Sequence, residues 1–485
     1  METIRFVDTT LRDGHQSLWA ESMRTGMMLA VAEQMDRAGF EAMEIISSSH
    51  IKKCVRELYE DPWERVRLVS QKITQTPLRV IIGGRNGFDL TPAAVQQLFL
   101  ERMAANGVRE GRISDEWNDL DGWKRTVQIA RAAGLDPIVN IIYSVSPKHT
   151  DAYFVEKARQ AATLGVPRLC FKDPGGLLTP ERTRTLVPLI LANIGEIPLE
   201  FHTHCTTGLG PLCCVEAIEQ GIRVVNTALP PLANGSSNPS FFNVAGNARA
   251  LGYAIPVDQG LLEPVSEYFM TIARREHLPI GAPVEYDEAQ YLHQVPGGMI
   301  SNLGHQLARV GLGDRMEQAL EEVIQVRKEL GYPIMVTPLS QFVGSQAVIN
   351  IVVGERYREV TDQVILYALG RWGREGSDGV DPRVKEKILG RPRAQELARR
   401  KPPEPTVKEL RQKFGGPGVS DEELLLRYFL SREDIAALRA AGPPRTYEPV
   451  RDPLVPLLQG LAKRNDCTDI RVQQGGLLVH LTRSH

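Results

Sequence analysis

Short β-rich runs alternate with longer amphipathic stretches through the first half of the chain, and this alternation limits the fold more than any other feature. Eight apolar runs are candidate strands, at Ile4–Asp8, Ala42–Ile46, Arg79–Ile82, Arg112–Asp115, Pro137–Ile142, Leu169–Lys172, Leu199–His202 and Arg223–Thr227. Helical patterns separate them, at Gly26–Ala38, Ala93–Ala105, Trp123–Ala133, Ala152–Leu164, Pro180–Ile194 and Pro211–Gln220. Eight strand and helix units over about 250 residues predict an α/β fold of the (β/α)8 TIM barrel type.

A doubly wound parallel sheet is the alternative for such an alternation. It is disfavoured because no Gly-rich dinucleotide fingerprint follows the first strand. The candidate chemical groups also fall at the carboxyl ends of the predicted strands, where barrel enzymes place their sites.

The alternation stops near Pro296, and helical periodicity then dominates, for instance over Arg315–Leu330 and Pro338–Val353. The last forty residues combine a helical stretch, Leu454–Lys463, with two alternating runs around Gly475 and Gly476. We therefore predict a barrel over residues 1–295, a mainly helical C-terminal domain over 296–445 and a small α+β tail over 446–485. The tail is expected to serve subunit docking or oligomerisation.

Composition excludes several classes of function. The formal net charge is -2 for 485 residues, which gives no support to a nucleic-acid or membrane-surface role. No apolar stretch approaches the ~20 residues that span a bilayer, and the N-terminus lacks the blocks of a signal peptide. A cytoplasmic protein is expected. The six cysteines form no CxxC pair, so reduced thiols in the core are predicted rather than a zinc ribbon or a disulfide framework.

The segment from Asp8 to Leu18 reads Asp-Thr-Thr-Leu-Arg-Asp-Gly-His-Gln-Ser-Leu and directly follows the first predicted strand. It places a guanidinium, a carboxylate, an imidazole and an amide at one junction between strand and loop. Such crowding is typical of a reaction centre.

A second polar group lies at the seventh predicted strand, where His202 and His204 are separated by one residue. In an extended strand the two imidazoles lie on the same face, about 7 Å apart along the backbone, and can bind one metal ion. Paired histidines also occur in polar barrel mouths without a metal. Asp13, at the end of the first strand, could add an anionic oxygen.

These motifs resemble the biotin-dependent carboxyltransferase family, which includes the carboxyltransferase domain of pyruvate carboxylase, the oxaloacetate decarboxylase alpha subunit and the transcarboxylase central subunit. The opening segment is similar to the family's DTTxRDxHQSL stretch, and Lys172 to Leu178 is similar to its KDMAGLL segment. The helical region resembles the family's second domain at Val336 to Ala347 and at Gly354 to Tyr357. That domain is absent from the wider superfamily of isopropylmalate synthases and hydroxymethylglutaryl-CoA lyases.

The resemblance implies a four-ligand metal centre of Asp13, Lys172, His202 and His204. In the family the lysine is carbamylated by carbon dioxide, which turns a poor ligand into an anionic one. The alternative for Lys172 is an ion pair with Asp173 or Asp13. By resemblance the metal is zinc, manganese or cobalt, and mixed nitrogen and oxygen ligands suit all three.

Further roles follow from the same resemblance. Arg12 is expected to stabilise the enolate charge that develops on the substrate, and Gln16 to contact the substrate. Ser236 stands in a segment similar to the one in which the family carries a threonine that shuttles a proton between substrate and biotin. A serine in such a Gly-Ser-Ser loop is otherwise explained by turn chemistry.

Several positions depart from the family pattern. Gly83 stands where the family has an arginine that binds the carboxylate of pyruvate, and Arg85, two residues on, is a candidate replacement. The second strand ends in Glu44-Ile-Ile-Ser-Ser-Ser49 in place of a Gly-Gly-Ala pattern, and Cys205 replaces a usual aspartate. Losing a carboxylate clamp would cost several kcal/mol, by analogy with charged hydrogen bonds of about 1.5–3 kcal/mol each. The sequence therefore does not determine which compound accepts the carboxyl group.

The chain contains no Ala/Val-Met-Lys-Met tetrapeptide that could carry biotin, so the biotin is expected on a separate carrier protein. The leading hypothesis is a carboxyltransferase subunit that moves a carboxyl group between carboxybiotin and a small 2-oxo acid such as pyruvate or oxaloacetate. A biotin carrier, a biotin carboxylase subunit and a second copy of the chain are the expected partners. The alternatives are a biotin-independent aldolase or lyase, a carboxyltransferase for another acceptor, and a degenerate assembly subunit.

Overall fold

Eight parallel strands close into a barrel in the order β1-β10-β9-β8-β7-β6-β3-β2. The computed structural model describes residues 1–86, 89–295, 303–304, 307–308, 311–400, 404–448, 460–461, 469–474 and 477–482. The predicted strands are confirmed, with bounds that shift by at most two residues. They are β1 (Arg5–Asp8), β2 (Ala42–Ser47), β3 (Leu78–Gly83), β6 (Glu110–Ser114), β7 (Asp136–Ile142), β8 (Arg168–Asp173), β9 (Leu199–Thr203) and β10 (Val224–Thr227).

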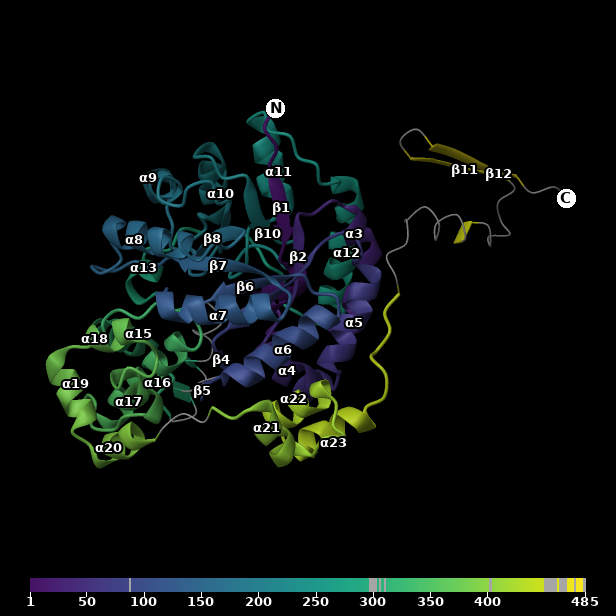
Figure 1. Cartoon of the computed structure of the whole chain (residues 1–485). Coiled ribbons are helices and arrows are strands. Elements are labelled where there is room, and N and C mark those ends of the chain that lie inside the picture. Colours follow the sequence, from purple (N-terminus) through teal and green to yellow (C-terminus); the bar gives the residue numbers. More distant parts are fainter. Residues whose placement is uncertain are drawn as a thin grey trace.

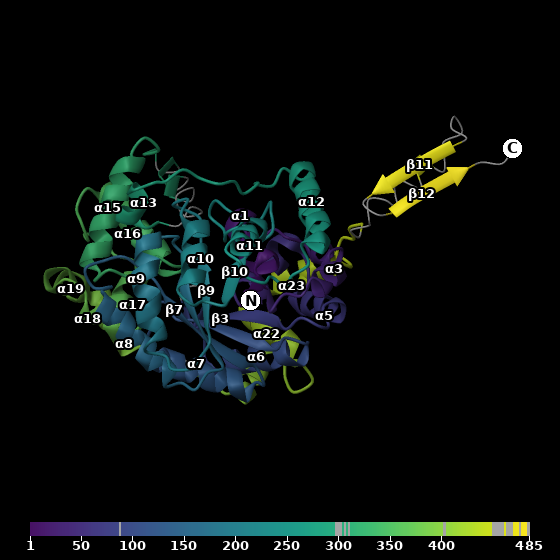
Figure 2. The ribbon, with the colours of Figure 1, turned by 90° about the horizontal axis from the view of Figure 1, so that it is seen from above.

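Helices surround the barrel (Figures 1 and 2). Polar N-caps set several of their starts: Asp61, Thr150 and Thr179 each accept backbone N–H groups in the following first turn. The helices are α2 (Thr25–Leu29), α3 (Ala32–Arg37), α4 (His50–Lys53), α5 (Pro62–Lys72), α6 (Ala93–Ala105), α7 (Leu120–Ala132), α8 (Asp151–Ala162), α9 (Pro180–Leu191), α10 (Gly210–Glu219), α11 (Phe241–Ala250) and α12 (Gln259–Arg275).

The local structure differs from the predicted pattern in two places. The single helix expected over Gly26–Ala38 is two helices, α2 and α3, separated by a turn at Ala30 and Val31. The motif after β1 is itself helical, because Thr10–Gly14 forms the π-helix η1 and His15–Leu18 forms α1. A second π-helix, η2 (Cys54–Leu58), follows α4, and β4 (Arg85–Asn86) pairs antiparallel with β5 (Asp89–Leu90).

The mainly helical C-terminal part is also confirmed, and it has a hydrophobic core of its own that includes Trp117, Phe342, Tyr367 and Trp372. Arg327 of α15 joins it to the barrel by donating to the Ser144 hydroxyl and to the Val145 carbonyl at 3.1 and 3.0 Å, just beyond β7. Its helices are α15 (Met316–Glu329), α16 (Leu339–Val353), α17 (Asp362–Ala368), α18 (Arg374–Asp378), α19 (Pro382–Leu389) and α20 (Pro392–Arg399), preceded by α13 (Ala289–His293).

The last three helices belong with the barrel core rather than with that second core: α21 (Val407–Phe414), α22 (Asp421–Phe429) and α23 (Arg432–Ala440) contribute leucines to the same apolar cluster as the barrel. Ion pairs add to this packing, from Arg67 to Glu422 at 2.6 Å and from Arg56 to Asp434 at 3.0 Å. Figure 1 shows these helices beneath α4 and α6. The domain boundaries at 295 and 445 stay a prediction.

The tail contains the predicted hairpin. Strands β11 (Asp469–Gln474) and β12 (Leu477–Thr482) pair antiparallel, with Gln474 opposite Leu477. The helix expected at Leu454–Lys463 lies largely outside the described residues. Of the cysteines in the described ranges, all five are buried free thiols, as predicted, and Cys467 lies outside those ranges. No helix within the described ranges is both long and apolar enough to cross a membrane.

Candidate metal centre and active site

Asp13, His202 and His204 converge at the carboxyl end of the barrel strands. The Nε2 atoms of His202 and His204 lie 3.3 and 3.6 Å from Oδ2 of Asp13. One ligand atom from each residue falls within 4.8 Å of the others, and all three side chains are buried. A carboxylate and two imidazoles at this spacing fit a divalent metal ion.

Lys172 lies directly beside this group, because it pairs with His202 in the parallel register of β8 and β9. Its side chain is buried, and no described residue forms a hydrogen bond or an ion pair with its amine. Burial, aided by the nearby Arg112 guanidinium, lowers the pKa of Lys172 to about 8. A buried lysine with a weakened hold on its proton is suited to carbamylation, because only the neutral amine attacks carbon dioxide.

The expected competitor for Lys172 is occupied elsewhere. The Asp173 carboxylate accepts the backbone N–H groups of Leu177 and Leu178, each at 2.9 Å, and the Thr203 hydroxyl, also at 2.9 Å. It therefore holds the loop after β8 and forms no ion pair with Lys172.

Asn226 of β10 fixes the orientation of His202. Its amide nitrogen donates to Glu200 at 3.3 Å, which turns its oxygen toward Nδ1 of His202 at 3.0 Å. In the tautomer that donates from Nδ1 to Asn226, the lone pair lies on Nε2, the atom that faces Asp13. Burial, followed by the Arg112 charge, lowers the pKa of His202 to about 3, so the imidazole is neutral.

The loop after β10 holds the second imidazole. Nδ1 of His204 donates to the Ser236 carbonyl oxygen at 2.6 Å. The Ser236 hydroxyl donates to the Ser17 carbonyl oxygen at 2.9 Å, and the Ser17 hydroxyl donates to Asp13 at 3.1 Å. Ser236 thus lies at the site and positions a ligand, whereas its role as a proton shuttle stays a prediction.

Arg12 is bound between two carboxylates. Its Nη2 donates to Asp13 at 2.8 Å, and its Nε donates to Glu44 of β2 at 2.9 Å. The other oxygen of Glu44 lies 2.8 Å from Nη2 of Arg112, which is fully buried inside the barrel. Burial acts to raise the pKa of Asp13, but Arg12 and the two imidazoles outweigh it and hold that pKa well below its usual range.

The remaining predicted site residues are placed less fully. Gln16 lies one turn along from Arg12, whose Nη1 donates to the Gln16 side-chain oxygen at 3.3 Å. The backbone of Arg85 pairs with Leu90 where β4 meets β5, but its side chain lies outside the described part of the structure. Its predicted role in substrate binding stays a prediction.

Two residues of this network had no predicted role. Glu44 was noted only as a departure at the end of the second strand, and Asn226 was not singled out. Each is a polar residue within an apolar run that faces the barrel interior, where aliphatic side chains usually dominate. That break in the apolar pattern is the signal that could have identified them.

The carboxyl end of β3 is open where the family arginine is expected. Gly83 borders a cavity that Phe429 of α22 helps to enclose, together with Ser48, Ile82, Thr91, Gln96 and Phe99. Nε2 of Gln96 is buried there and has no hydrogen-bond partner among the described residues. Cys205, the other departure beside the metal group, is a buried thiol whose pKa is raised by burial.

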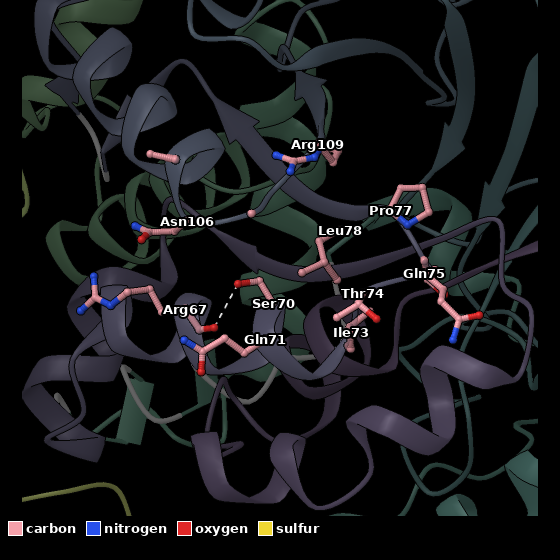
Figure 3. Close-up of a pocket in the computed structure, with 13 residues that line it drawn as sticks. Arg67, Ser70, Gln71, Ile73, Thr74, Gln75, Pro77, Leu78, Asn106 and Arg109 are labelled. Carbon is pink, nitrogen blue, oxygen red and sulfur yellow. Dashed lines mark hydrogen bonds between the residues drawn. The ribbon is translucent and has the colours of Figure 1, made fainter.

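A separate cleft lies at the opposite end of the barrel (Figure 3). It is lined by residues before β3 and β6, among them Arg67, Pro77, Leu78 and Arg109. Barrel enzymes react at the carboxyl ends of their strands, and this cleft lies at the amino ends, so it takes no part in the candidate site.

Comparison with known proteins identifies the family of the chain. Residues 3–268 match the HMGL-like family model, and residues 291–438 match the model described as the conserved carboxylase domain. A pyruvate carboxylase subunit from Methanocaldococcus jannaschii is 37% identical over 390 residues, which cover 80% of this chain and 68% of that protein. The chain belongs to the biotin-dependent carboxyltransferase family.

Two further relatives extend this family match. The 2-oxoglutarate carboxylase large subunit of Hydrogenobacter thermophilus is 34% identical, with 80% of this chain and 60% of that protein covered. The carboxyl transferase domain of Rhizobium etli pyruvate carboxylase, solved with pyruvate and biocytin, superposes with a TM-score of 0.79. That match covers 91% of this chain and 78% of the other at 23% identity, so it shows a shared fold. The chain is an enzyme of the biotin-linked carboxyltransferase type.

Proposed function

We propose that this chain is the subunit that moves a carboxyl group between carboxybiotin, carried on a separate polypeptide, and a small 2-oxo acid. The observation that carries the proposal is the convergence of Asp13, His202 and His204, with Lys172 beside His202, at the catalytic end of the barrel. The relatives named as subunits of pyruvate and 2-oxoglutarate carboxylases support the reaction class. They also support a biotin carrier and a biotin carboxylase as partners.

The metal would be held by Asp13, His202, His204 and a carbamylated Lys172, and zinc, manganese and cobalt all suit this donor set. When bound, such a metal supplies Lewis acidity toward the oxygen of a 2-oxo acid. Arg12 places a fixed positive charge next to the same space, where an enolate oxygen of the substrate would develop its charge. Gln16 adds an amide for the substrate.

The surroundings of Gly83 bear on which compound accepts the carboxyl group. Gly83 leaves the carboxyl end of β3 without the cation expected for pyruvate, and the cavity beside it is small and mainly apolar. The missing cation, together with the similarity to a 2-oxoglutarate carboxylase subunit, favours an acceptor other than pyruvate, such as a longer 2-oxo acid. A biotin-independent lyase on the same barrel is the alternative, favoured by the same missing arginine.

The test is decarboxylation of 2-oxo acids by the metal-loaded protein, with and without free biotin. We expect oxaloacetate or a longer 2-oxo acid such as oxalosuccinate to lose its carboxyl group faster when biotin is present. Cleavage that is indifferent to biotin would favour the lyase. No reaction with any 2-oxo acid would overturn the proposed function.

A further inference from the structure

Residues 279–292 run from the end of α12 into α13, without regular structure up to residue 287 and helical from Ala289, and we call them the rim strap (Figure 2). Two hydrogen bonds hold the first residues of the strap against the barrel. The Trp19 indole donates to the Pro279 carbonyl at 2.8 Å, and the Gly281 N–H donates to the Pro231 carbonyl at 2.8 Å. A Cβ at Gly281 would lie 2.0 Å from the Ala233 carbonyl oxygen, so only glycine allows this approach.

The rim strap continues over the loop that follows the second imidazole. A Cβ at Gly208 would lie 2.5 Å from the Val284 carbonyl oxygen, and one at Gly235 would lie 3.6 Å from the Ala282 carbonyl oxygen. The strap therefore rests on the loops after β9 and β10. Those same loops carry His204 and Ser236, so the strap packs on the loops that build the candidate metal centre.

The rim strap exposes several large apolar side chains. Four large hydrophobic side chains are unusually exposed along it: Ile280 at 45%, Val284 at 41%, Tyr286 at 57% and Leu292 at 61%. Leu212, at the start of α10 beyond Gly208, is 56% exposed. Exposed large apolar residues gathered on one segment beside a candidate site are typical of a partner surface.

Carboxylates are interspersed with these apolar residues. Glu285, Asp287 and Glu288 are all exposed. A partner that fits this surface would present an apolar patch bounded by lysine or arginine, because complementary charge guides the encounter and fixes its orientation.

We propose that the rim strap is the docking surface for the biotin-carrying domain. This inference rests on the function proposed above. The reaction requires a group tethered to another polypeptide to enter the barrel mouth, so the carrier must rest on the rim at the moment of transfer. The strap combines a backbone hydrogen-bonded to the barrel at its start, exposed apolar side chains and close approach to the loops that hold the metal ligands.

The experiment compares two biotin sources in one decarboxylation assay: free biotin, and the purified biotinylated carrier protein of the same organism. The variants are Tyr286→Ser, Leu292→Ser and Glu285→Lys, all at exposed positions. Leu251→Ser is the matched control, since Leu251 is 46% exposed at the end of α11, away from the mouth. We expect KM for the carrier to rise about tenfold or more in the strap variants, because truncated aromatic anchors dominate interface energetics.

The rate with free biotin is expected to stay within twofold in every variant, and the control should match the wild type with both sources. Equal losses with free biotin and with the carrier would overturn the proposal, and so would an unchanged KM for the carrier. A drop in the sedimentation mass of the strap variants would assign the surface to a second copy of the chain instead. A wild-type protein inactive with both sources would overturn the proposed function itself.

Discussion

Arg12, in the helix that follows β1, contacts Glu44 of the neighbouring strand β2, with Nε of Arg12 2.9 Å from Oε2 of Glu44. The same carboxylate reaches Nη2 of Arg112 at 2.8 Å, so one buried acid holds two buried arginines. Arg12 contacts Asp13 and Gln16, and Arg112 lies beside His202. Glu44 therefore links the group that should contact substrate to the residues that surround the metal ligands.

Replacing Glu44 with Gln should separate these two arginines. Neutralising one partner of a buried ion pair costs about 3 kcal/mol, and the displaced Arg12 should slow turnover roughly 100-fold. Thermal unfolding and steady-state kinetics measure the two effects. Glu60→Gln is the matched control, because Glu60 pairs with Arg65 at 2.9 Å with both side chains buried outside the barrel interior. It should lose comparable stability and keep most of its turnover, whereas equal kinetic losses would argue against a positioning role for Glu44.

Replacing Lys172 with Ala is expected to lower metal occupancy and abolish turnover, because one of four ligands is removed. Metal content after dialysis, measured by mass spectrometry, tests the first effect. Lys157→Ala is the control: Lys157 is another buried lysine, but it pairs with Glu375 at 2.7 Å on the outer helix α8. A Lys172→Ala protein with full metal content and activity would remove Lys172 from the metal centre.

The lowered pKa of Lys172, about 8, predicts a pH dependence in the metal-free protein. The neutral amine becomes the main form above about pH 8 in the folded state, against about pH 10.4 in the unfolded chain. At fixed carbon dioxide pressure, carbamate formation should therefore rise as the pH increases through 8. The unfolded chain binds the extra proton between these two values, so stability should also rise with pH there.

Nuclear magnetic resonance with 13C-labelled carbon dioxide can follow that carbamate. The Lys172→Ala protein is the control and should lack the signal. A signal of equal size in both proteins would place the carbamate on another amine.

Replacing Asn226 with Leu should weaken metal binding about 10- to 100-fold, because the imidazole of His202 loses the partner that fixes its proton on Nδ1. Titration calorimetry with zinc or manganese measures this directly. Asn140→Leu is matched in burial and lies on β7 of the same barrel, where its amide donates to Ser114 at 2.7 Å. It should retain wild-type affinity, and a similar loss in both variants would indicate general damage to the barrel interior.

Replacing Gly83 with Arg should improve the use of pyruvate or oxaloacetate about tenfold in kcat/KM, since it adds a charged hydrogen bond for the substrate carboxylate. Gly84→Arg is the control, because a side chain there meets no other atom within 4 Å of its Cβ. Better pyruvate use in the second variant alone would place the substrate on the other side of the loop.

Much of the barrel and of the metal centre could be predicted because both depend on local patterns. Apolar runs define strands, and the carboxyl end of each strand meets the others at one mouth, so Asp13 and His202 could be assigned to one site. The polar residues that interrupt the apolar strands, Glu44 and Asn226, are harder to assign from sequence. Whether Glu44 faces Arg12 or solvent depends on the register between β1 and β2, and whether Asn226 reaches His202 depends on the register between β10 and β9.

The packing of the last three helices could not be predicted for the same reason. Leu424 and Leu438 lie in amphipathic patterns that suit any apolar surface, and sequence alone does not say which core they join. Phe429 closes a cavity at Gly83, a contact between residues from distant parts of the chain.

The pairing of β1 with β10 has a consequence for synthesis of the protein. Asp13 follows the first strand of the barrel, whereas His202 and His204 lie near the end of the barrel sequence. The three ligands can meet only after the last strand has closed against the first. Metal binding therefore requires a completed barrel. A nascent or truncated chain that stops before β9 lacks both histidines and cannot bind the metal at an incomplete site.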